Sequence, residues 1–384
     1  MLRNPKNHHS PSVTTLALRT ASAVLFGLGL AAAQDAGTHN LPSEIADAGV
    51  KVQKVMGKTP DGSRNLGYSE GPAADLEGNL YFTEDNSGQG NIWKVNAAGA
   101  SSNFFHGPSI PNGLEFDNIG KLFSAEMAAV ATYDVKVGAS SRTKLTMSVT
   151  LAPNIRINDL SVGSNGGVWF TNQIGGNQYF YRDPSGQVTT YDNIAPLGVP
   201  VPNGIEWIEE KKILLITSSN DNKVFQFDVS ADFKPSNKKL FANVPIPDGL
   251  TVDANGNIYI ASFGSGKVYV FAPTGGTGGV VGMELGTIDV QTGGQKKISN
   301  CAFGGPGNKT LYMTGTGGAY KIQLKIPGRT RPGVAPIRLR TGSLRIAPRP
   351  FSEGYTIAGR KVDLVQAQRQ APGSFRNVIK TLPK

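Results

Sequence analysis

The sequence predicts an all-β protein whose main part is a six-bladed β-propeller, and three observations carry that prediction. The first is composition, because 48 Gly and 24 Pro among 384 residues are typical of a turn-rich β protein. The second is a pattern that recurs six times at intervals of 42–52 residues, the length of one four-stranded blade. The third is that each repeat holds two short apolar runs joined by a turn that contains Gly in five of the six repeats, without the 3.6-residue period of helical repeats.

The first 33 residues predict a secretory signal peptide. Three basic residues come first, an apolar run over 21–30 follows, and three alanines at 31–33 provide small residues for cleavage. The apolar run is shorter than the ~20 residues that span a bilayer, so we expect cleavage after about Ala33 and a secreted or periplasmic protein without a membrane span. Residues 34–49 are expected to form a linker.

Each repeat opens with an oxygen-bearing side chain, usually followed by Gly, at the start of its first strand. We call these six residues the anchors: Glu70, Asn112, Asn158, Asn203, Asp248 and Asn300. Equivalent positions of a radial repeat lie on one ring around the axis, so the anchors are expected at one mouth of the central channel. The segment 50–55 precedes the first anchor and is expected to pair into the last blade and close the ring, so that the propeller covers 50–327.

The anchors have the chemistry of a site for a hard cation. They comprise two carboxylates and four amides, and Ca²⁺ takes six to eight oxygen ligands of these kinds. A zinc site would favour His or Cys, and two buried carboxylates without a counter-charge would be unstable. Turn geometry alone also favours Asn or Asp before Gly, although this alternative does not explain Glu70.

The anchors belong to longer motifs that resemble one family. The motifs are Ser69-Glu70-Gly71-Pro72, Pro111-Asn112-Gly113-Leu114, Arg156-Ile157-Asn158-Asp159, Pro202-Asn203-Gly204, Pro247-Asp248-Gly249-Leu250 with Asp253 and Gly256, and Asn300-Cys301-Ala302-Phe303-Gly304-Gly305 with Thr310-Leu311-Tyr312. Their order and spacing resemble the gluconolactonase, senescence-marker-protein and luciferin-regenerating-enzyme family over about residues 65–325. The resemblance implies a six-bladed, calcium-dependent lactonase.

The resemblance also implies roles for individual residues. Glu70, Asn203 and Asp248 would hold the cation, with Ca²⁺ expected and Zn²⁺ or Mn²⁺ as alternatives. Asn158 would lie beside the cation and contact metal, water or substrate. Arg156 would bind substrate, and Asn112 would line the pocket.

The chain departs from the family pattern at two positions. Asn172 stands where many relatives carry Asp, and Met127 stands where many bacterial relatives carry His. Both are expected to face the substrate. The departures therefore put in question whether the substrate is the usual sugar lactone, while the metal prediction is unaffected.

The leading functional hypothesis is hydrolysis of a lactone or a related ester. The cation would polarise the carbonyl group and hold the attacking water, with Asp248 as the general base and a cation-held hydroxide as the alternative nucleophile. Arg156 would bind ring oxygens or the developing oxyanion. A second hypothesis is an exported, non-enzymatic binding propeller with a structural calcium. A third is a histidine-based esterase, for which His106 is a weak candidate because a loop role explains it better.

The basic charge is concentrated beyond the propeller. Residues 328–384 hold twelve Lys and Arg against two acids, whereas 34–327 holds 23 basic and 26 acidic residues. The body therefore has no charge signature of a nucleic-acid-binding protein. The Pro- and Arg-rich extension is expected to contact an anionic surface or sorting machinery, with a simple disordered tail as the alternative. The single cysteine, Cys301, excludes a disulfide framework and is expected to be a core thiol.

Overall fold

The computed structural model describes residues 35–86, 88–152, 155–174, 176–192, 196–290 and 297–330, together with 354–355 and 361–362. The expected signal peptide and most of the basic extension lie outside these residues. The chain divides into a unit Met1–Val334 and a unit Ala335–Lys384, and the described part of the second unit is one strand pair, β26 (Gly354–Tyr355) and β27 (Lys361–Val362). Within the described residues, no helix has the length and apolarity needed to cross a membrane.

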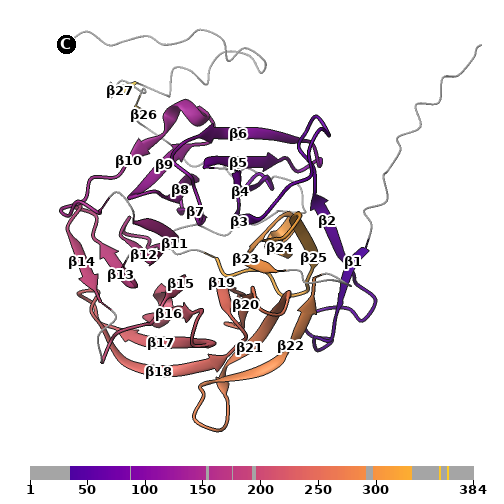
Figure 1. Cartoon of the computed structure of the whole chain (residues 1–384), viewed down its shortest axis with the longest axis vertical. Coiled ribbons are helices and arrows are strands. Elements are labelled where there is room, and N and C mark those ends of the chain that lie inside the picture. The colour runs from indigo at the N-terminus through magenta and orange to yellow at the C-terminus, as the bar shows by residue number, and fades with distance from the viewer. Residues whose placement is uncertain are drawn as a thin grey trace, which may run out of the picture. The chain divides into compact units, whose positions relative to one another are not determined.

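The first unit is a ring of six blades, as the repeat predicted (Figure 1). Blade I contains β3 (Ser69–Ala74), β4 (Leu80–Asn86), β5 (Gln89–Val95) and β6 (Ser101–Gly107); blade II contains β7 (Leu114–Phe116), β8 (Lys121–Glu126), β9 (Ala129–Asp134) and β10 (Thr143–Lys144); blade III contains β11 (Arg156–Val162), β12 (Val168–Ile174), β13 (Gln178–Arg182) and β14 (Val188–Tyr191). Blade IV contains β15 (Pro202–Ile208), β16 (Ile213–Ser218), β17 (Lys223–Val229) and β18 (Pro235–Asn243); blade V contains β19 (Pro247–Val252), β20 (Ile258–Ser262), β21 (Lys267–Gly275) and β22 (Gly282–Asp289); blade VI contains β23 (Ile298–Gly304), β24 (Thr310–Gly315), β25 (Gly318–Gln323) and β2 (Val52–Met56). Three single-turn 3₁₀ helices, Ala139–Ser141, Glu209–Lys211 and Pro306–Asn308, lie between strands.

The ring is closed by the N-terminal part of the body. Strand β2 pairs antiparallel with β25, which is the closure that the sequence predicted for 50–55. Strand β1 (Asp35–His39) pairs with both β2 and β22 and so joins blades V and VI into one nine-stranded sheet. The segment expected as a linker thus contributes a strand, because it covers the free outer edges of two blades.

Apolar side chains fill the space between neighbouring blades. The buried residues form six clusters, each drawn from two adjacent blades. Between blades III and IV, for example, Trp169 packs against Trp207 with ring centroids 6.3 Å apart. Cys301 is 2% exposed in the cluster between blades V and VI, where burial raises its pKa, in keeping with the predicted core thiol. The packed interfaces hold the six innermost strands, β3, β7, β11, β15, β19 and β23, around one axis (Figure 1).

The end of the propeller opposite the anchors is closed by the residues that follow β25. The N–H of Ala254 donates to the carbonyl of Pro327 at 2.8 Å, and the N–H of Arg329 donates to the carbonyl of Val252 at 3.0 Å. The Arg329 guanidinium forms an ion pair with Glu206 at 2.6 Å, in which each side chain is 11% exposed. Residues 328 and 329, expected to begin the extension, therefore pack against the propeller.

Candidate cation site at the axis of the propeller

Every anchor lies at or beside the first residues of the innermost strand of its blade, and we call this end of the propeller the anchor end. Pairing with the second strand is irregular there, as between Glu70 and Ala73, between Pro202 and Ile205, and between Pro247 and Leu250. Such bulges turn a side chain out of the regular alternation of the strand. The anchors are buried despite their polarity, with exposed fractions of 6% for Glu70, 7% for Asn112, 5% for Asn203, 4% for Asp248 and 7% for Asn300, while Asn158 is half-buried.

The glycines that follow the anchors allow the blades to approach one another at the axis. A Cβ on Gly249 would lie 2.0 Å from the amide of Asn300, and a Cβ on Gly113 would lie 2.3 Å from Oδ1 of Asp159. The repeated polar-residue-then-Gly pattern thus has a steric cause, because a Cβ after the anchor would meet backbone or side-chain atoms of another blade.

Two carboxylates from non-adjacent blades meet at the hydroxyl of Tyr68. This hydroxyl donates to Oε1 of Glu70 at 2.9 Å and lies 3.3 Å from Oδ2 of Asp248, 180 residues away in the sequence. Oε2 of Glu70 accepts a hydrogen bond from the N–H of Gly71 at 3.3 Å. The structure therefore brings together the two anchors that carry negative charge.

Asn203 supplies an amide oxygen to the same cluster. Its Nδ2 donates to the Ser219 hydroxyl at 3.0 Å, and its amide lies close enough to Asp248 to oppose the rise that burial causes in the pKa of that carboxyl. Oδ1 of Asn203 is buried and has no hydrogen-bond partner among the described residues. A buried, unsatisfied carbonyl oxygen destabilises a fold by about 1–3 kcal/mol, so a ligand for this atom would stabilise the protein.

The cluster holds more negative charge than the surrounding protein compensates. Burial raises the pKa of Glu70 to about 7, although hydrogen bonds and the charge of Arg156 oppose the shift. The pKa of Asp248 is raised well above its ordinary value, first by burial and then by Glu70 and Asp159. Burial also raises the pKa of Asp159, with further contributions from Glu70 and Glu115. The raised pKa values mean that these carboxyls favour the protonated form when no cation is bound. A bound divalent ion would instead stabilise their charged form.

The positive charge of Arg156 lowers the pKa of Glu70 and so opposes the effect of burial. Arg156 begins β11, and its Nη1 lies 3.2 Å from Oδ2 of Asp85 at the end of β4. The Arg156 side chain is 26% exposed and that of Asp85 is 33% exposed. The guanidinium of Arg156, in blade III, is thus oriented by a carboxylate of the non-adjacent blade I, while part of it remains accessible from solvent.

The other three anchors use their polar groups within the protein. Nδ2 of Asn158 donates to Gln173 at 3.1 Å, and the Asn158 carbonyl accepts from Nδ2 of Asn112 at 2.9 Å. Nδ2 of Asn300 lies 3.5 Å from Asp159, and its Oδ1 accepts from the N–H of Cys301 at 2.8 Å. The side chains of Asn112 and Asn300 therefore connect blades. Asn158 is half-buried and comes two residues after Arg156 on β11.

The two departures from the family pattern lie in different environments. Met127 is half-buried and bridges to Arg156 at the anchor end. Asn172 is fully buried in β12, and neither amide atom has a hydrogen-bond partner among the described residues. Because the proposed cation ligands are buried as well, the expectation that both residues face a substrate stays a prediction.

The residues present fit a hard cation. Glu70, Asp248 and Asn203 offer two carboxylates and an unsatisfied amide oxygen from three blades. Among the described residues, no group of three or more His, Cys, Asp or Glu side chains could hold a metal, and the three donors named here are all oxygens because the third comes from an amide. This set suits Ca²⁺ better than Zn²⁺.

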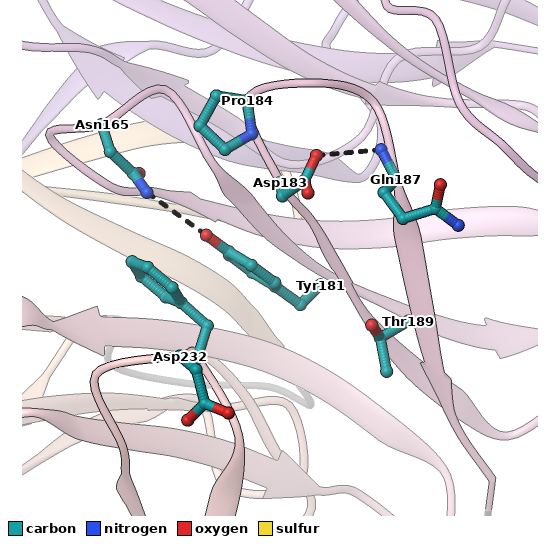
Figure 2. A pocket seen from close by; sticks show the side chains of 8 residues that line it. Asn165, Tyr181, Asp183, Pro184, Gln187, Thr189 and Asp232 are labelled. Atoms are coloured by element: carbon teal, nitrogen blue, oxygen red, sulfur yellow. Dashed lines mark hydrogen bonds between the residues drawn. The ribbon is translucent and has the colours of Figure 1, made fainter.

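His106 and the pocket in Figure 2 lie apart from this cluster. His106 is on β6, the outermost strand of blade I, and its Nδ1 is 2.9 Å from Oδ1 of Asn91. A pocket of about 250 Å³ is lined by the turns that contain Asn165, Asp183 and Asp232 (Figure 2). These turns lie at the end of the propeller opposite the anchors, and no anchor lines the pocket.

Sequence reasoning assigned no role to Tyr68, Asp85 or Asp159. Asp159 carried a weak signal, because it occupies the position after an anchor where four other repeats have Gly. Tyr68 and Asp85 carried none, since their contacts are with residues of distant blades.

Comparisons with known proteins identify the family and the fold. The family described as "SMP-30/Gluconolactonase/LRE-like region" matches residues 68–317. Pentonolactonase XacC of Haloferax volcanii is 30% identical over 171 residues, which cover 42% of this chain and 54% of that protein. The match therefore spans about half the length of that curated relative.

Two solved structures share the fold. A gluconolactonase from Xanthomonas campestris superposes with a TM-score of 0.62 at 19% identity, covering 76% of this chain and 97% of that one. The calcium-binding protein regucalcin from Agrobacterium tumefaciens superposes with a TM-score of 0.56 at 19% identity, covering 72% of this chain and 96% of that one. At these identities the likeness is one of fold.

Proposed function

The chain belongs to the SMP-30/Gluconolactonase/LRE-like family, and we propose that it is a hydrolase that opens a lactone with the help of a divalent cation. The observation that supports the proposal is that Glu70 and Asp248, from two blades, both approach the Tyr68 hydroxyl, while Asn203 of a third blade has a buried Oδ1 without a hydrogen-bond partner among the described residues. The named relative from Haloferax volcanii is a lactonase, which supports the same reaction class.

Glu70, Asn203 and Asp248 would hold the cation, and the half-buried Asn158 would contact it, its water or the substrate. When bound, the ion would polarise the substrate carbonyl and lower the pKa of a water molecule. Ca²⁺ is the ion that the oxygen donors favour, and a regucalcin of the same fold is calcium-binding. Mn²⁺ and Zn²⁺ are the alternatives for the test below.

The protein side chains divide the remaining work. Asp248 would accept the proton of the attacking water, because one of its oxygens faces Tyr68 and the other is available to the site. The water oxygen bonds to the carbonyl carbon, the ring C–O bond breaks, and the proton taken up by Asp248 passes to the leaving ring oxygen, so that the product is a hydroxy acid and Asp248 is restored. Arg156, oriented by Asp85, would bind the substrate oxygens and stabilise the developing negative charge. Asn112 would line the pocket through its backbone position rather than its amide, which already binds Asn158.

Chelation with metal add-back tests the proposal. Hydrolysis of a panel of aldonolactones and alkyl lactones should disappear after dialysis against EDTA and return with CaCl₂, MnCl₂ or ZnCl₂. Asp248→Asn should lose at least 100-fold in kcat, whereas Asp289→Asn, which changes a 37% exposed carboxylate, should not. A hydrolysis rate that survives exhaustive chelation contradicts the mechanism. Calorimetric calcium binding without hydrolysis of any lactone supports the alternative of a non-enzymatic binding propeller.

We also propose that the protein is exported and that its signal peptide is cleaved after about Ala33. The first strand begins at Asp35, so cleavage there leaves every described strand intact. N-terminal sequencing of the mature protein tests this point, and a retained leader would contradict it. The basic extension would contact an anionic surface or sorting machinery, which a deletion of 331–384 combined with cell fractionation can test.

A further inference from the structure

Tyr68 occupies a position at the candidate site that neither the repeat nor the proposed mechanism uses. It comes two residues before Glu70, and an isolated bridge to Thr316 places its backbone at the edge of blade VI. Its hydroxyl lies within hydrogen-bond distance of both carboxylates of the cluster, at 2.9 Å from Glu70 and 3.3 Å from Asp248. One phenol thus connects blades I and V across the axis.

The direction of the Tyr68 ring is fixed by contacts that do not involve the hydroxyl. Phe263, in the turn after β20, meets the ring edge-on with centroids 5.7 Å apart and planes at 74°. Phe263 in turn contacts the ammonium of Lys297, which lies 4.1 Å from the centroid of its ring. Because these contacts involve only the aromatic faces and edges, phenylalanine at position 68 would keep them.

The hydroxyl has one hydrogen and faces two carboxylates. The phenol is a hydrogen-bond donor whose single hydrogen is directed at Glu70, with Asp248 also within reach. It engages one oxygen of each carboxylate, at Oε1 of Glu70 and Oδ2 of Asp248. Each carboxylate therefore has a second oxygen that the phenol does not engage, and that of Glu70 accepts only the 3.3 Å hydrogen bond from the Gly71 N–H among the hydrogen bonds given above. The shared hydroxyl limits how far the two like charges can move apart.

We propose that Tyr68 is a positioning residue that sets the cation affinity of the site by holding Glu70 and Asp248 at the spacing that a divalent ion requires. The inference rests on the proposed function, because it assumes that these carboxylates bind the ion. Groups that hydrogen-bond to metal ligands commonly contribute 10–100-fold to metal affinity. Removal of the hydroxyl alone should therefore weaken calcium binding by at least tenfold.

The test uses Tyr68→Phe in the full mature chain. Titration calorimetry with CaCl₂ should give a dissociation constant at least tenfold higher than that of the unsubstituted protein, and the calcium-induced rise in melting temperature should shrink. Tyr81→Phe is the matched control, because Tyr81 lies in the same blade and its hydroxyl has no hydrogen-bond partner among the described residues. Phe263→Leu, which changes the ring contact and keeps the hydroxyl, should alter calcium affinity less than Tyr68→Phe.

A kinetic measurement separates positioning from substrate contact. At saturating calcium, Tyr68→Phe should regain most of its kcat with little change in KM, and only the calcium concentration for half-maximal activity should rise. Calcium affinity that is unchanged or tighter in Tyr68→Phe overturns the inference while the proposed function stands, provided that the unsubstituted protein binds calcium. If the unsubstituted protein binds no Ca²⁺, Mn²⁺ or Zn²⁺, the proposed function fails and this inference fails with it.

Discussion

The ion pair at the end of the propeller opposite the anchors gives the sharpest stability prediction. Arg329 lies beyond the last strand, yet its Nη2 contacts Oε1 of Glu206 at 2.6 Å and donates to the carbonyl of Trp207 at 2.9 Å. Each side chain of the Arg329–Glu206 pair is 11% exposed. Removal of one partner of a buried pair costs about 3–5 kcal/mol, because the other charge stays buried. Arg329→Met should therefore lower the free energy of unfolding by about that amount.

Thermal and chemical unfolding measure the effect. With an unfolding entropy of about 2.1 cal/mol/K per residue, 3 kcal/mol corresponds to a fall in melting temperature of about 5 °C for a propeller of this size. Lys234→Met is the control, because Lys234 and Asp232 form a pair whose side chains are 75% and 60% exposed, and exposed pairs contribute at most about 1 kcal/mol. Glu206→Gln in the Arg329→Met background should recover part of the loss, since it removes the buried charge.

Truncation separates the ion pair from the rest of the extension. A chain that ends after residue 330 keeps Arg329 and should unfold like the full chain. A chain that ends after residue 326 should be destabilised as much as Arg329→Met, or more. If Arg329→Met and Lys234→Met shift the melting temperature equally, the pair is not buried in solution and the reasoning is refuted.

Three further predictions concern the anchor end. The pKa of Glu70 rises from 4.5 to about 7 on folding, so the cation-free protein should lose stability as pH rises between these values. The raised pKa values of Asp248 and Asp159 act in the same direction. Melting curves in EDTA at pH 5 and pH 8 test this expectation, and a higher melting temperature at pH 8 contradicts it. Gly249→Ala should destabilise the fold by about 1–3 kcal/mol in urea unfolding, since its Cβ would lie 2.0 Å from the Asn300 amide, whereas Gly49→Ala, with no atom within 4 Å, should be close to neutral; equal effects would argue against the steric role of Gly249. Arg156→Lys keeps the charge but loses the planar fork, so KM for a lactone substrate should rise about tenfold with calcium affinity unchanged, and an unaltered KM would exclude Arg156 from substrate binding.

The sequence was informative wherever one blade repeats the constraints of another. The anchors, the glycines after them and the ring-closing strand β2 all follow from a geometry that recurs around the axis. Strand β1 was not predictable, because Asp-Ala-Gly-Thr-His has no apolar alternation and forms a strand only by pairing with edges that blades V and VI already provide. Arg329 was equally hidden, since it is the first of many basic residues in a region of uniform composition.

The anchors also show why a symmetric repeat produces an asymmetric site. Asn112 and Asn300 have the same place in their blades as Asn203, but the amide of Asn112 binds the Asn158 carbonyl and that of Asn300 binds Cys301 and approaches Asp159. Asn203 differs because Ser219 takes only its Nδ2, which leaves Oδ1 directed at no protein donor. The residue type at an anchor is therefore insufficient to assign a ligand, and the deciding factor is the hydrogen-bond supply from the neighbouring blade. Substitution of Ser219 by alanine would free Nδ2 of Asn203 and let the amide rotate, so we expect weaker calcium binding in Ser219→Ala with an intact fold. Calcium affinity equal to that of the unsubstituted protein would show that the orientation of Asn203 does not depend on Ser219.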